Sequence, residues 1–410
     1  MPVGLYISIP FCRTKCTYCN FASDVFSKAV FRRYLDRVCQ DIEHSVANAE
    51  QMGGRLECVA DTVYLGGGTP TVLEIEQLER LFVTISQNFE VSPAAEITVE
   101  CAPGTLTPAV IATLQRCGVN RVSLGVQSFV DREAASVGRL HNREKVLNDI
   151  TRLQAGGVTN INVDLIAGLP HQTAESWELS LQQTIASGVP HVSVYMLEVD
   201  EDSRLGRELI AGGTRYHAHF VPDEDLTADM YLRACERLEA AGVRQYEISN
   251  FAREGYMSRH NLKYWVRQPY LGFGVDAHSM LKVEQRFSAA LRPPEIEAVR
   301  FSTADSLEEY MAGKGRSQTA VDRQGALEET FFLRLRLSSG VDLQRVAADF
   351  GESAVSDRSQ VLADLVQTGL LEQKGEIIRL TSRGRLLSNE VFQRFLATDR
   401  MGTGALVRPG

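Results

Sequence analysis

Short apolar segments alternate with longer amphipathic segments along the first half of the chain. The short segments have the length of buried β-strands, and glycine, proline or polar residues bound them. In the longer segments apolar residues recur every three or four positions, as at Tyr34, Leu35, Val38 and Ile42, which predicts helices with one buried face. Six strands are expected, at residues 3–9, 61–65, 96–100, 121–125, 160–166 and 191–196.

Helices are expected between these strands, at residues 27–49, 74–89, 108–117, 143–155 and 174–187. Strands that alternate with helices in this way form right-handed βαβ units, so the strands pair in parallel and the fold class is α/β. The pattern does not decide whether the sheet stays open or curves into a barrel.

The pattern changes in the last third of the chain. Helical segments surround a short hairpin near residues 370–380, which predicts a smaller, mostly helical, winged-helix-like domain. The expected helices cover residues 327–337, 343–350, 355–368 and 381–395. A DNA-reading helix needs basic and polar groups that face a groove, but residues 355–368 mix Asp357, Arg358 and Asp364. We therefore expect a cover or docking surface here.

Four divisions of the chain are predicted: a core at 1–200, an extension at 201–300, a C-terminal domain at 301–400 and a disordered tail at 401–410. The break before the C-terminal domain is placed near Pro293-Pro294 and Gly313. Residues 200–223 are expected to form an irregular surface loop. His217 and His219 are expected to belong to that loop and not to a metal site.

Composition narrows the class of protein. The chain has 410 residues, a net charge of −9 and eight cysteines. No apolar run reaches ~18 residues, so no transmembrane helix is expected, and the start of the sequence leads us to expect no signal peptide. Eight cysteines in so long a chain favour a reducing cytoplasm over a disulfide scaffold. The acidic balance argues against nucleic acid as a partner.

Cys12, Cys16 and Cys19 follow the first predicted strand at C-x3-C-x2-C spacing. Pro10 ends that strand because it lacks an N–H, so the cysteines lie in a loop at its carboxyl end. Three such thiols can bind zinc, form disulfides or hold an iron–sulfur cluster. A closed zinc site needs a fourth ligand that this loop lacks. A four-iron cluster on three thiolates leaves one iron open to the amine and carboxylate of S-adenosylmethionine (SAM).

Polar residues and glycines stand at the ends of the other predicted strands. Residues 66–70 follow the second strand, Glu100 ends the third, Gln127 follows the fourth and Asp164 lies at the end of the fifth. In barrels of parallel strands the chemistry lies at the carboxyl ends. Glycines let the backbone approach a ligand closely, and carboxylates bind hydroxyls or amines. Each carboxylate alone is equally compatible with a helix cap or a solvated group.

The cysteine triad, with Tyr6 before it and Tyr18 inside it, resembles the signature of the radical SAM enzymes. The run Gly66-Gly67-Gly68-Thr69-Pro70 looks like their SAM-binding loop. This resemblance implies a partial (β/α)6 barrel and a 4Fe–4S cluster on the three cysteines, with SAM on the fourth iron. An electron from the cluster would cleave SAM to methionine and a 5′-deoxyadenosyl radical.

Residues 125–129, 138–139 and 162–170 are similar to the oxygen-independent coproporphyrinogen III dehydrogenase group. The resemblance implies that Tyr6 and Tyr18 flank the cluster and SAM. It further implies that SAM is contacted by Gly67, Gly68 and Thr69 at its methionyl end, and by Glu100, Gln127, Arg139 and Asp164 at its nucleoside and carboxylate. An electron donor such as a flavodoxin or a ferredoxin is implied as a partner.

The run His260-Asn-x-x-Tyr264-Trp265 allows two interpretations. Histidine can ligate haem iron and aromatic rings can stack on a porphyrin, but a packed aromatic corner around a satisfied histidine is the plainer alternative. The run resembles a motif that distinguishes the HemW haem chaperones from the related enzymes. The dehydrogenases carry a further cysteine after the triad, where this chain has Asn20-Phe21. The resemblance implies a chaperone, with His260 as the first candidate haem ligand and His278 as the second.

Three functions compete on this basis. A haem chaperone would bind haem and hand it to an acceptor apoprotein, and peripheral contact with a membrane is compatible with that role. A dehydrogenase would abstract a hydrogen from a propionate side chain, and carbon dioxide would leave. A DNA-binding regulator would use the C-terminal domain, which conflicts with the acidic charge.

Overall fold

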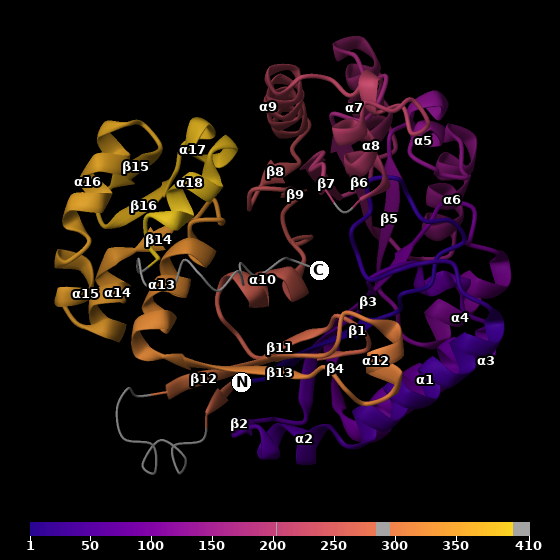
Figure 1. Ribbon diagram of the computed structural model, residues 1–410, viewed down its shortest axis with the longest axis horizontal. Helices are drawn as coiled ribbons and strands as arrows, with labels where there is room; N and C mark the ends of the chain where they lie inside the picture. Colours follow the sequence, from indigo (N-terminus) through magenta and orange to yellow (C-terminus); the bar gives the residue numbers. More distant parts are fainter. Residues whose placement is uncertain (202, 284–295, 397–410) are drawn as a thin grey trace.

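The computed structural model describes residues 1–201, 203–283 and 296–396. A large curved sheet forms the body of the protein, and a small three-stranded sheet lies in the C-terminal unit (Figure 1). The predicted break at Pro293-Pro294 and the predicted tail at 401–410 lie outside the described residues. No helix in the described ranges is long and apolar enough to cross a membrane.

Six parallel strands form the core of the large sheet, in the spatial order β1-β3-β4-β5-β6-β7. They are β1 Val3–Ser8, β3 Val59–Gly66, β4 Glu90–Cys101, β5 Arg121–Gln127, β6 Asn160–Ala167 and β7 His191–Met196. The helices between them are α1 Lys28–Glu43, α2 Ser45–Gln51, α3 Ile75–Asn88, α4 Pro108–Arg116, α5 Asp131–Ser136, α6 Arg143–Ala155 and α7 Ala174–Ala186, with the 3-10 turn η1 Pro70–Val72. The predicted parallel α/β core is confirmed.

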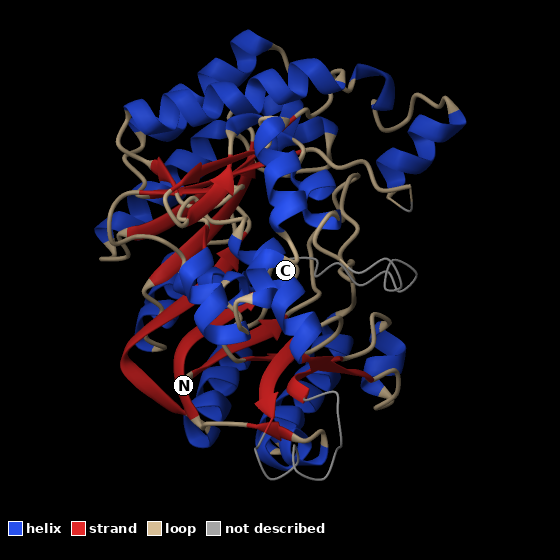
Figure 2. Ribbon diagram, turned by 90° about the vertical axis from the view of Figure 1, so that its left-hand side faces the viewer, coloured by secondary structure: helices blue, strands red, loops and turns tan. Residues whose placement is uncertain are grey.

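Strand side chains alternate between the helices and the interior of the curved sheet. Leu5 and Ile7 of β1 join the main hydrophobic core with Tyr34 and Leu35 of α1. The intervening Tyr6 points to the other face, where it meets Tyr64 of β3. Figure 2 shows the strands as a curved band with helices packed outside them. The concave interior is therefore available for polar groups and ligands.

Further strands extend both edges of the parallel core. Next to β1 the sheet continues with β10 Tyr270–Phe273 (parallel), β11 His278–Val283, β12 Ile296–Ser302 and β13 Ser317–Asp322, and β2 Gly54–Arg55 pairs with β11. Next to β7 it continues with β9 Asn250–Ala252 and β8 Arg244–Gln245. Strands β12 and β13 carry the large sheet past residue 301, where the sequence analysis placed the start of the C-terminal domain.

The C-terminal unit is mostly helical, as expected, and has a hydrophobic core of its own that includes Phe331, Leu362 and Ile378. Its sheet has the order β14-β16-β15. Its elements are α13 Arg323–Arg334, β14 Val341–Asp342, α14 Leu343–Phe350, α15 Ser353–Ser356, α16 Ser359–Gln367, β15 Leu371–Lys374, β16 Ile377–Leu380, α17 Ser382–Leu386 and α18 Ser388–Gln393. The helix expected at 355–368 is therefore two helices, α15 and α16.

The segment that was expected to be irregular contains a helix, α8 Arg204–Ala211, and the 3-10 turn η2 Ala218–Phe220. Ser203 caps α8 by accepting a hydrogen bond from the N–H of Gly206 at 2.9 Å. Leu205 is fully buried, and its N–H donates to the carbonyl of Thr17 in the cysteine loop at 2.8 Å. This contact explains the wrong prediction, because tertiary packing stabilises a helix too short for a clear periodic pattern.

The remaining helices are α9 Glu224–Ala240, α10 Arg259–Trp265 and α12 Leu307–Met311.

Candidate functional site

The three cysteines of the triad lie in the loop that follows β1, and backbone hydrogen bonds hold this loop. The N–H of Cys12 donates to the carbonyl of Asp24 at 3.0 Å, and the N–H of Cys19 donates to that of Cys16 at 3.3 Å. All eight cysteines of the chain are free thiols, which contradicts the disulfide alternative. Among the described residues no three potential ligands converge on a single ion. A closed zinc site takes four ligands on one ion, whereas a four-iron cluster binds each thiolate to a different iron.

Each sulfur of the triad has at least one polar side chain beside it. Thr69 Oγ1 donates to Cys12 Sγ at 3.9 Å, Arg139 Nη1 donates to Cys16 Sγ at 3.5 Å, and Ser23 Oγ lies 3.8 Å from Cys19 Sγ. Burial raises the pKa of Cys12 and of Cys19, so both stay protonated until a metal displaces the proton. Donors aimed at sulfur suit thiolates that bind iron.

The glycine loop after β3 packs directly on the cysteine loop. The N–H of Thr69 donates to the carbonyl of Phe11 at 2.8 Å, and the N–H of Ile9 donates to that of Gly66 at 2.7 Å. A Cβ at Gly68 would lie 2.6 Å from the carbonyl oxygen of Ile9. Only glycine fits at this position, so the close approach of the two loops explains the run of glycines.

Glu100 reaches the glycine loop from β4. Its carboxylate accepts hydrogen bonds from the hydroxyl of Tyr64 at 2.8 Å and from the backbone of Gly67. Burial, together with the nearby charge of Asp164, raises the pKa of Glu100 to about 7. The hydroxyl of Tyr6 would lie 3.2 Å from a Cβ at Gly67, so Tyr6 borders the same loop. At neutral pH this carboxyl can therefore donate or accept a hydrogen bond.

The sequence predicted that Asp164 lies at the end of its strand. This is wrong, because β6 continues to Ala167. The residue keeps its interior orientation: its carboxylate accepts hydrogen bonds from Ser123 Oγ at 3.0 Å and from Asn162 Nδ2 at 2.7 Å. Burial raises the pKa of Asp164. The carboxylate is thus held rigidly, one layer inside the mouth of the barrel.

Gln127 and Arg139 carry buried polar atoms without a partner. Gln127 ends β5 in a left-handed conformation with φ +66°, and its Oε1 accepts no hydrogen bond. Arg139 donates to the carbonyl of Gly125 and to Cys16, but its Nε has no acceptor. Burial raises the pKa of Tyr18. The charge of Cys16 acts in the same direction, and the charge of Arg139 acts against it. Unsatisfied buried groups are costly, so these atoms indicate a place for a polar ligand.

His260, on α10, is 1% exposed and has both ring nitrogens engaged. Nδ1 lies 2.8 Å from Thr62 Oγ1, and Nε2 lies 2.8 Å from the hydroxyl of Tyr264. Its ring is 5.2 Å from that of Tyr64. Burial, together with the charge of Lys263, lowers the pKa of His260 to about 3. The residue is therefore neutral and packed in an aromatic corner beneath the glycine loop.

The other histidines singled out by the sequence lie nearer the surface. The His278 side chain is 57% exposed, and its Nε2 lies 3.7 Å from the carboxylate of Asp276. His217 Nδ1 lies 3.3 Å from His171 Nε2, and the ring of His219 lies 4.0 Å from that of Phe220. No third ligand joins them around an ion in the part of the chain that the structure describes.

Several residues that shape the site were not predicted. Tyr64 orients Glu100, while Ser123 and Asn162 orient Asp164. Alternation along β3 could have identified Tyr64, since it shares a strand face with Gly66 two residues later. Ser23 follows the triad by four residues, and no motif in the sequence sets it apart from the other polar residues of that loop.

Comparison with known proteins identifies the family. Residues 6–183 match the Radical SAM superfamily, and residues 321–387 match the HemN C-terminal domain. The chain is 35% identical over 395 residues to a protein of Bacillus subtilis (strain 168) named heme chaperone HemW, covering 95% of this chain and 98% of the relative. The chain belongs to the HemW family. The resemblance read from its motifs is therefore confirmed.

Other members of the HemW family align over a similar length. The relative from Escherichia coli (strain K12) is 30% identical over 398 residues, covering 97% of this chain and 98% of its own. The relative from Mycobacterium tuberculosis (strain H37Rv) is 33% identical over 403 residues, covering 96% and 95%. Both are named heme chaperone HemW. Membership of the radical SAM superfamily implies a 4Fe–4S cluster and SAM as cofactors.

The fold agrees with a solved structure described as coproporphyrinogen III oxidase (HemN) from Escherichia coli, a radical SAM enzyme. The TM-score is 0.79 at 24% sequence identity, and the match covers 96% of this chain and 90% of that one. This likeness confirms the predicted fold class, a radical SAM barrel followed by a mostly helical C-terminal domain.

Proposed function

We propose that this HemW-family protein is a haem chaperone that binds haem and passes it to an acceptor apoprotein. The observation that carries the proposal is the full-length identity of 30–35% to relatives named heme chaperone HemW. Asn20 supports it, because the related dehydrogenases carry a cysteine just after the triad and this chain does not. Asn20 instead donates a hydrogen bond to Asp200 at 3.0 Å.

Cys12, Cys16 and Cys19 would hold three irons of the cluster, and SAM would bind the fourth. When bound, the cluster supplies the electron that cleaves SAM. The donors to the sulfurs and the two packed loops support this assignment. An electron donor such as a flavodoxin or a ferredoxin would reduce the cluster, and the reducing cytoplasm is the location that suits such chemistry.

The mouth of the barrel would hold SAM. Gly67, Gly68 and Thr69 offer backbone to its methionyl end, while Glu100, Gln127, Arg139 and Asp164 offer side chains to its carboxylate and nucleoside, and Tyr6 and Tyr18 flank it. The unpartnered Gln127 Oε1 and Arg139 Nε support this assignment, since a ligand with donors and acceptors would satisfy both. Because the pKa of Glu100 is about 7, its carboxyl can either donate a hydrogen bond to a ribose hydroxyl or accept one from it.

The haem role of His260 stays a prediction. An iron bond from either ring nitrogen has to replace a hydrogen bond to Thr62 or Tyr264. His278, the second candidate, is exposed and needs no such rearrangement. Replacing each histidine by alanine and following the absorption of bound haem distinguishes the two.

The second candidate function is an oxygen-independent coproporphyrinogen III dehydrogenase, which the match to the HemN C-terminal domain at residues 321–387 favours. One experiment separates the two functions. The full chain is reconstituted anaerobically with iron, sulfide, SAM and a reductant, and it receives either coproporphyrinogen III or haem. Saturable haem binding without decarboxylated porphyrinogen supports the chaperone. Repeated turnover of coproporphyrinogen III would overturn it, and the triple alanine variant of the triad serves as the cluster-free control.

A further inference from the structure

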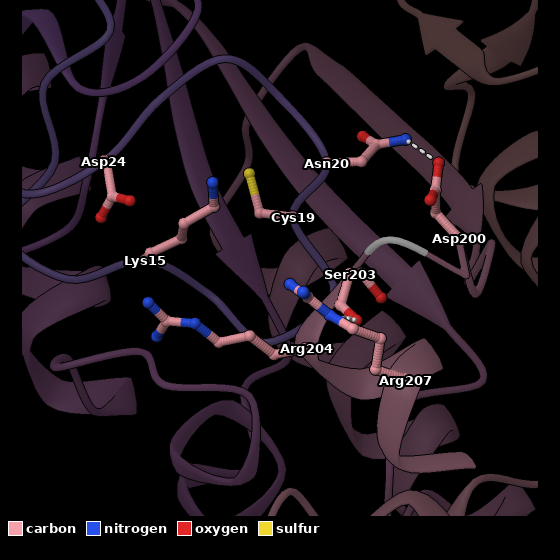
Figure 3. A pocket seen from close by; sticks show the side chains of 8 residues that line it. All are labelled: Lys15, Cys19, Asn20, Asp24, Asp200, Ser203, Arg204 and Arg207. Atoms are coloured by element: carbon pink, nitrogen blue, oxygen red, sulfur yellow. Dashed lines mark hydrogen bonds between the residues drawn. The ribbon is translucent and has the colours of Figure 1, made fainter. Parts of the chain in front are cut away.

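A cavity of about 360 Å³ opens beside Cys19, between the cysteine loop and α8. Figure 3 shows the side chains of Lys15, Arg204 and Arg207 around it. Arg204 and Arg207 stand one turn apart on α8, and Lys15 belongs to the cysteine loop. Three cations from two segments therefore surround one opening, although the whole chain carries a net charge of −9.

A second cavity of about 430 Å³ adjoins the first and shares Arg204 and Arg207 with it. Arg215, Ala211 and Tyr216 also line this second cavity. The guanidinium of Arg215 lies 5.4 Å from the centre of the Tyr216 ring. We call the two cavities together the α8 groove. It combines a cationic end next to the cysteine loop with an aromatic and apolar surface farther along α8.

The cations of the α8 groove have no acidic partner in the described part of the chain. No ion pair joins Lys15, Arg204, Arg207 or Arg215 to a carboxylate there. The groove therefore presents positive charge that an anionic ligand can neutralise.

The carboxylates that also line the α8 groove face protein donors. Asp24 accepts from the N–H of Val25 at 2.7 Å, and Asp200 accepts from Asn20 Nδ2 at 3.0 Å. Glu208, which is buried, accepts from the N–H of Tyr216. Among the residues that line the two cavities the four cations outnumber these three carboxylates, so the groove keeps an excess of positive charge.

The arginines are carried by a helix that is fixed in place. The N–H of Leu205 donates to Thr17 of the cysteine loop, and Leu205 is fully buried. Gly206 lies against the backbone of Asp200 so closely that no Cβ fits. The distance between the α8 cations and the cysteine loop is therefore set by the backbone, as a recognition site requires.

We propose that the α8 groove binds haem, with Lys15, Arg204 and Arg207 holding its two propionate carboxylates; this site rests on the proposed function. Guanidinium groups bind carboxylates in a bidentate way, and aromatic rings pack on porphyrins. A carrier must also present its cargo to the acceptor. The groove is open to solvent, whereas His260 is 1% exposed with both nitrogens engaged.

The test compares haem with haem dimethyl ester, which has the same ring and iron but no free carboxylate. Both are titrated into the reconstituted full chain, as wild type and as R204Q/R207Q. The matched control is R244Q/R253Q, which also removes two exposed arginines. The control pair lies at the opposite end of the strands, since Arg253 bonds to Pro190 just before β7. Iron content of each variant verifies that the cysteine loop is intact.

Wild type and the control should bind haem at least about tenfold more tightly than the ester. In R204Q/R207Q that preference should fall to nearly one, because the carboxylates lose their partners. An unchanged preference in R204Q/R207Q, or equal affinity of wild type for both compounds, would overturn the site. If R204Q/R207Q instead lost only the binding of an acidic carrier protein, the groove would be a protein-docking surface and the haem site would be wrong. Failure of wild type to bind either compound would defeat the proposed function itself.

Discussion

The hydroxyl of Tyr64 donates a hydrogen bond to Oε1 of Glu100 over 2.8 Å, deep in the mouth of the barrel. The two residues come from neighbouring strands, β3 and β4, which pair in parallel. The bond orients the carboxyl towards the glycine loop, where Gly67 supplies a second donor. A buried carboxyl held in this way has a titration that can be measured.

Glu100 should make the stability of the protein depend on pH. Burial raises its pKa from the ordinary 4.5 to about 7, so the folded chain holds this proton more tightly than the unfolded chain does. The resulting stability is complete below about pH 4.5 and is lost as pH rises through about 7. The free energy of unfolding should fall across this window by up to about 3 kcal/mol.

Urea unfolding of the cluster-free protein at about pH 5 and about pH 8 measures this effect. E100Q has no proton to release at this site, so its free energy of unfolding should fall less over the same window. Equal falls in the wild type and E100Q would show that Glu100 is not the titrating group.

Gly68→Ala should prevent assembly of the cluster site. The added Cβ would lie 2.6 Å from the Ile9 carbonyl oxygen and 3.0 Å from the Phe11 nitrogen, so the two loops have to separate. We expect a loss of roughly 2 kcal/mol in stability and of most iron bound after reconstitution. Gly188→Ala is the control: its left-handed φ of +72° also strains alanine, by about 1 kcal/mol, but nothing lies within 4 Å. Full iron content in Gly68→Ala would contradict the packing argument.

Arg139→Gln should make the bound cluster harder to reduce. Arg139 donates to Cys16 Sγ at 3.5 Å, and a cationic donor to a sulfur ligand stabilises the reduced cluster, which carries one more electron. The midpoint potential should become more negative by on the order of tens of millivolts. Redox titration monitored by electron paramagnetic resonance measures it, and a more positive potential in the variant would contradict the role given to Arg139. R132Q, on the exposed surface, should leave the potential unchanged.

His260→Ala should destabilise the fold by roughly 2–4 kcal/mol. The substitution leaves a cavity and deprives the hydroxyls of Thr62 and Tyr264 of their partner inside the protein. His278→Ala removes an exposed histidine, so its cost should stay within about 0.5 kcal/mol. Urea unfolding of both variants provides the comparison. Similar stability of the two variants would mean that the aromatic corner does not depend on His260.

The strands and the cysteine loop could be predicted because local signals agree there. Pro10 ends β1 and the triad follows at once, so the position of the loop needs no tertiary information. The prediction that Asp164 ends its strand was wrong because three apolar residues, up to Ala167, follow it in β6. A charged residue inside a strand is easily taken for the residue at which the strand ends. Helix α8 was missed since Leu205 gains its stability from Thr17, almost 190 residues away in the sequence.

The state of His260 could not be read from the sequence either. The motif contains Tyr264, which supplies one hydrogen bond, but the other comes from Thr62 on β3. Only the packing of α10 against that strand shows that both nitrogens are engaged. The α8 groove could not be predicted from the sequence for the same reason. Lys15 and Arg204 lie far apart in the chain and come together only when α8 packs on the cysteine loop.

Transfer of haem to an acceptor apoprotein is the direct test of the chaperone function. The reconstituted chain is loaded with haem, separated from free haem and mixed anaerobically with a haem-free b-type apoprotein of larger mass. Haem absorption is then followed in each protein after size separation. We expect haem to move to the acceptor faster than it is lost to a solution without acceptor. Haem that stays on the chain, or leaves at the same rate with and without acceptor, would contradict the chaperone function.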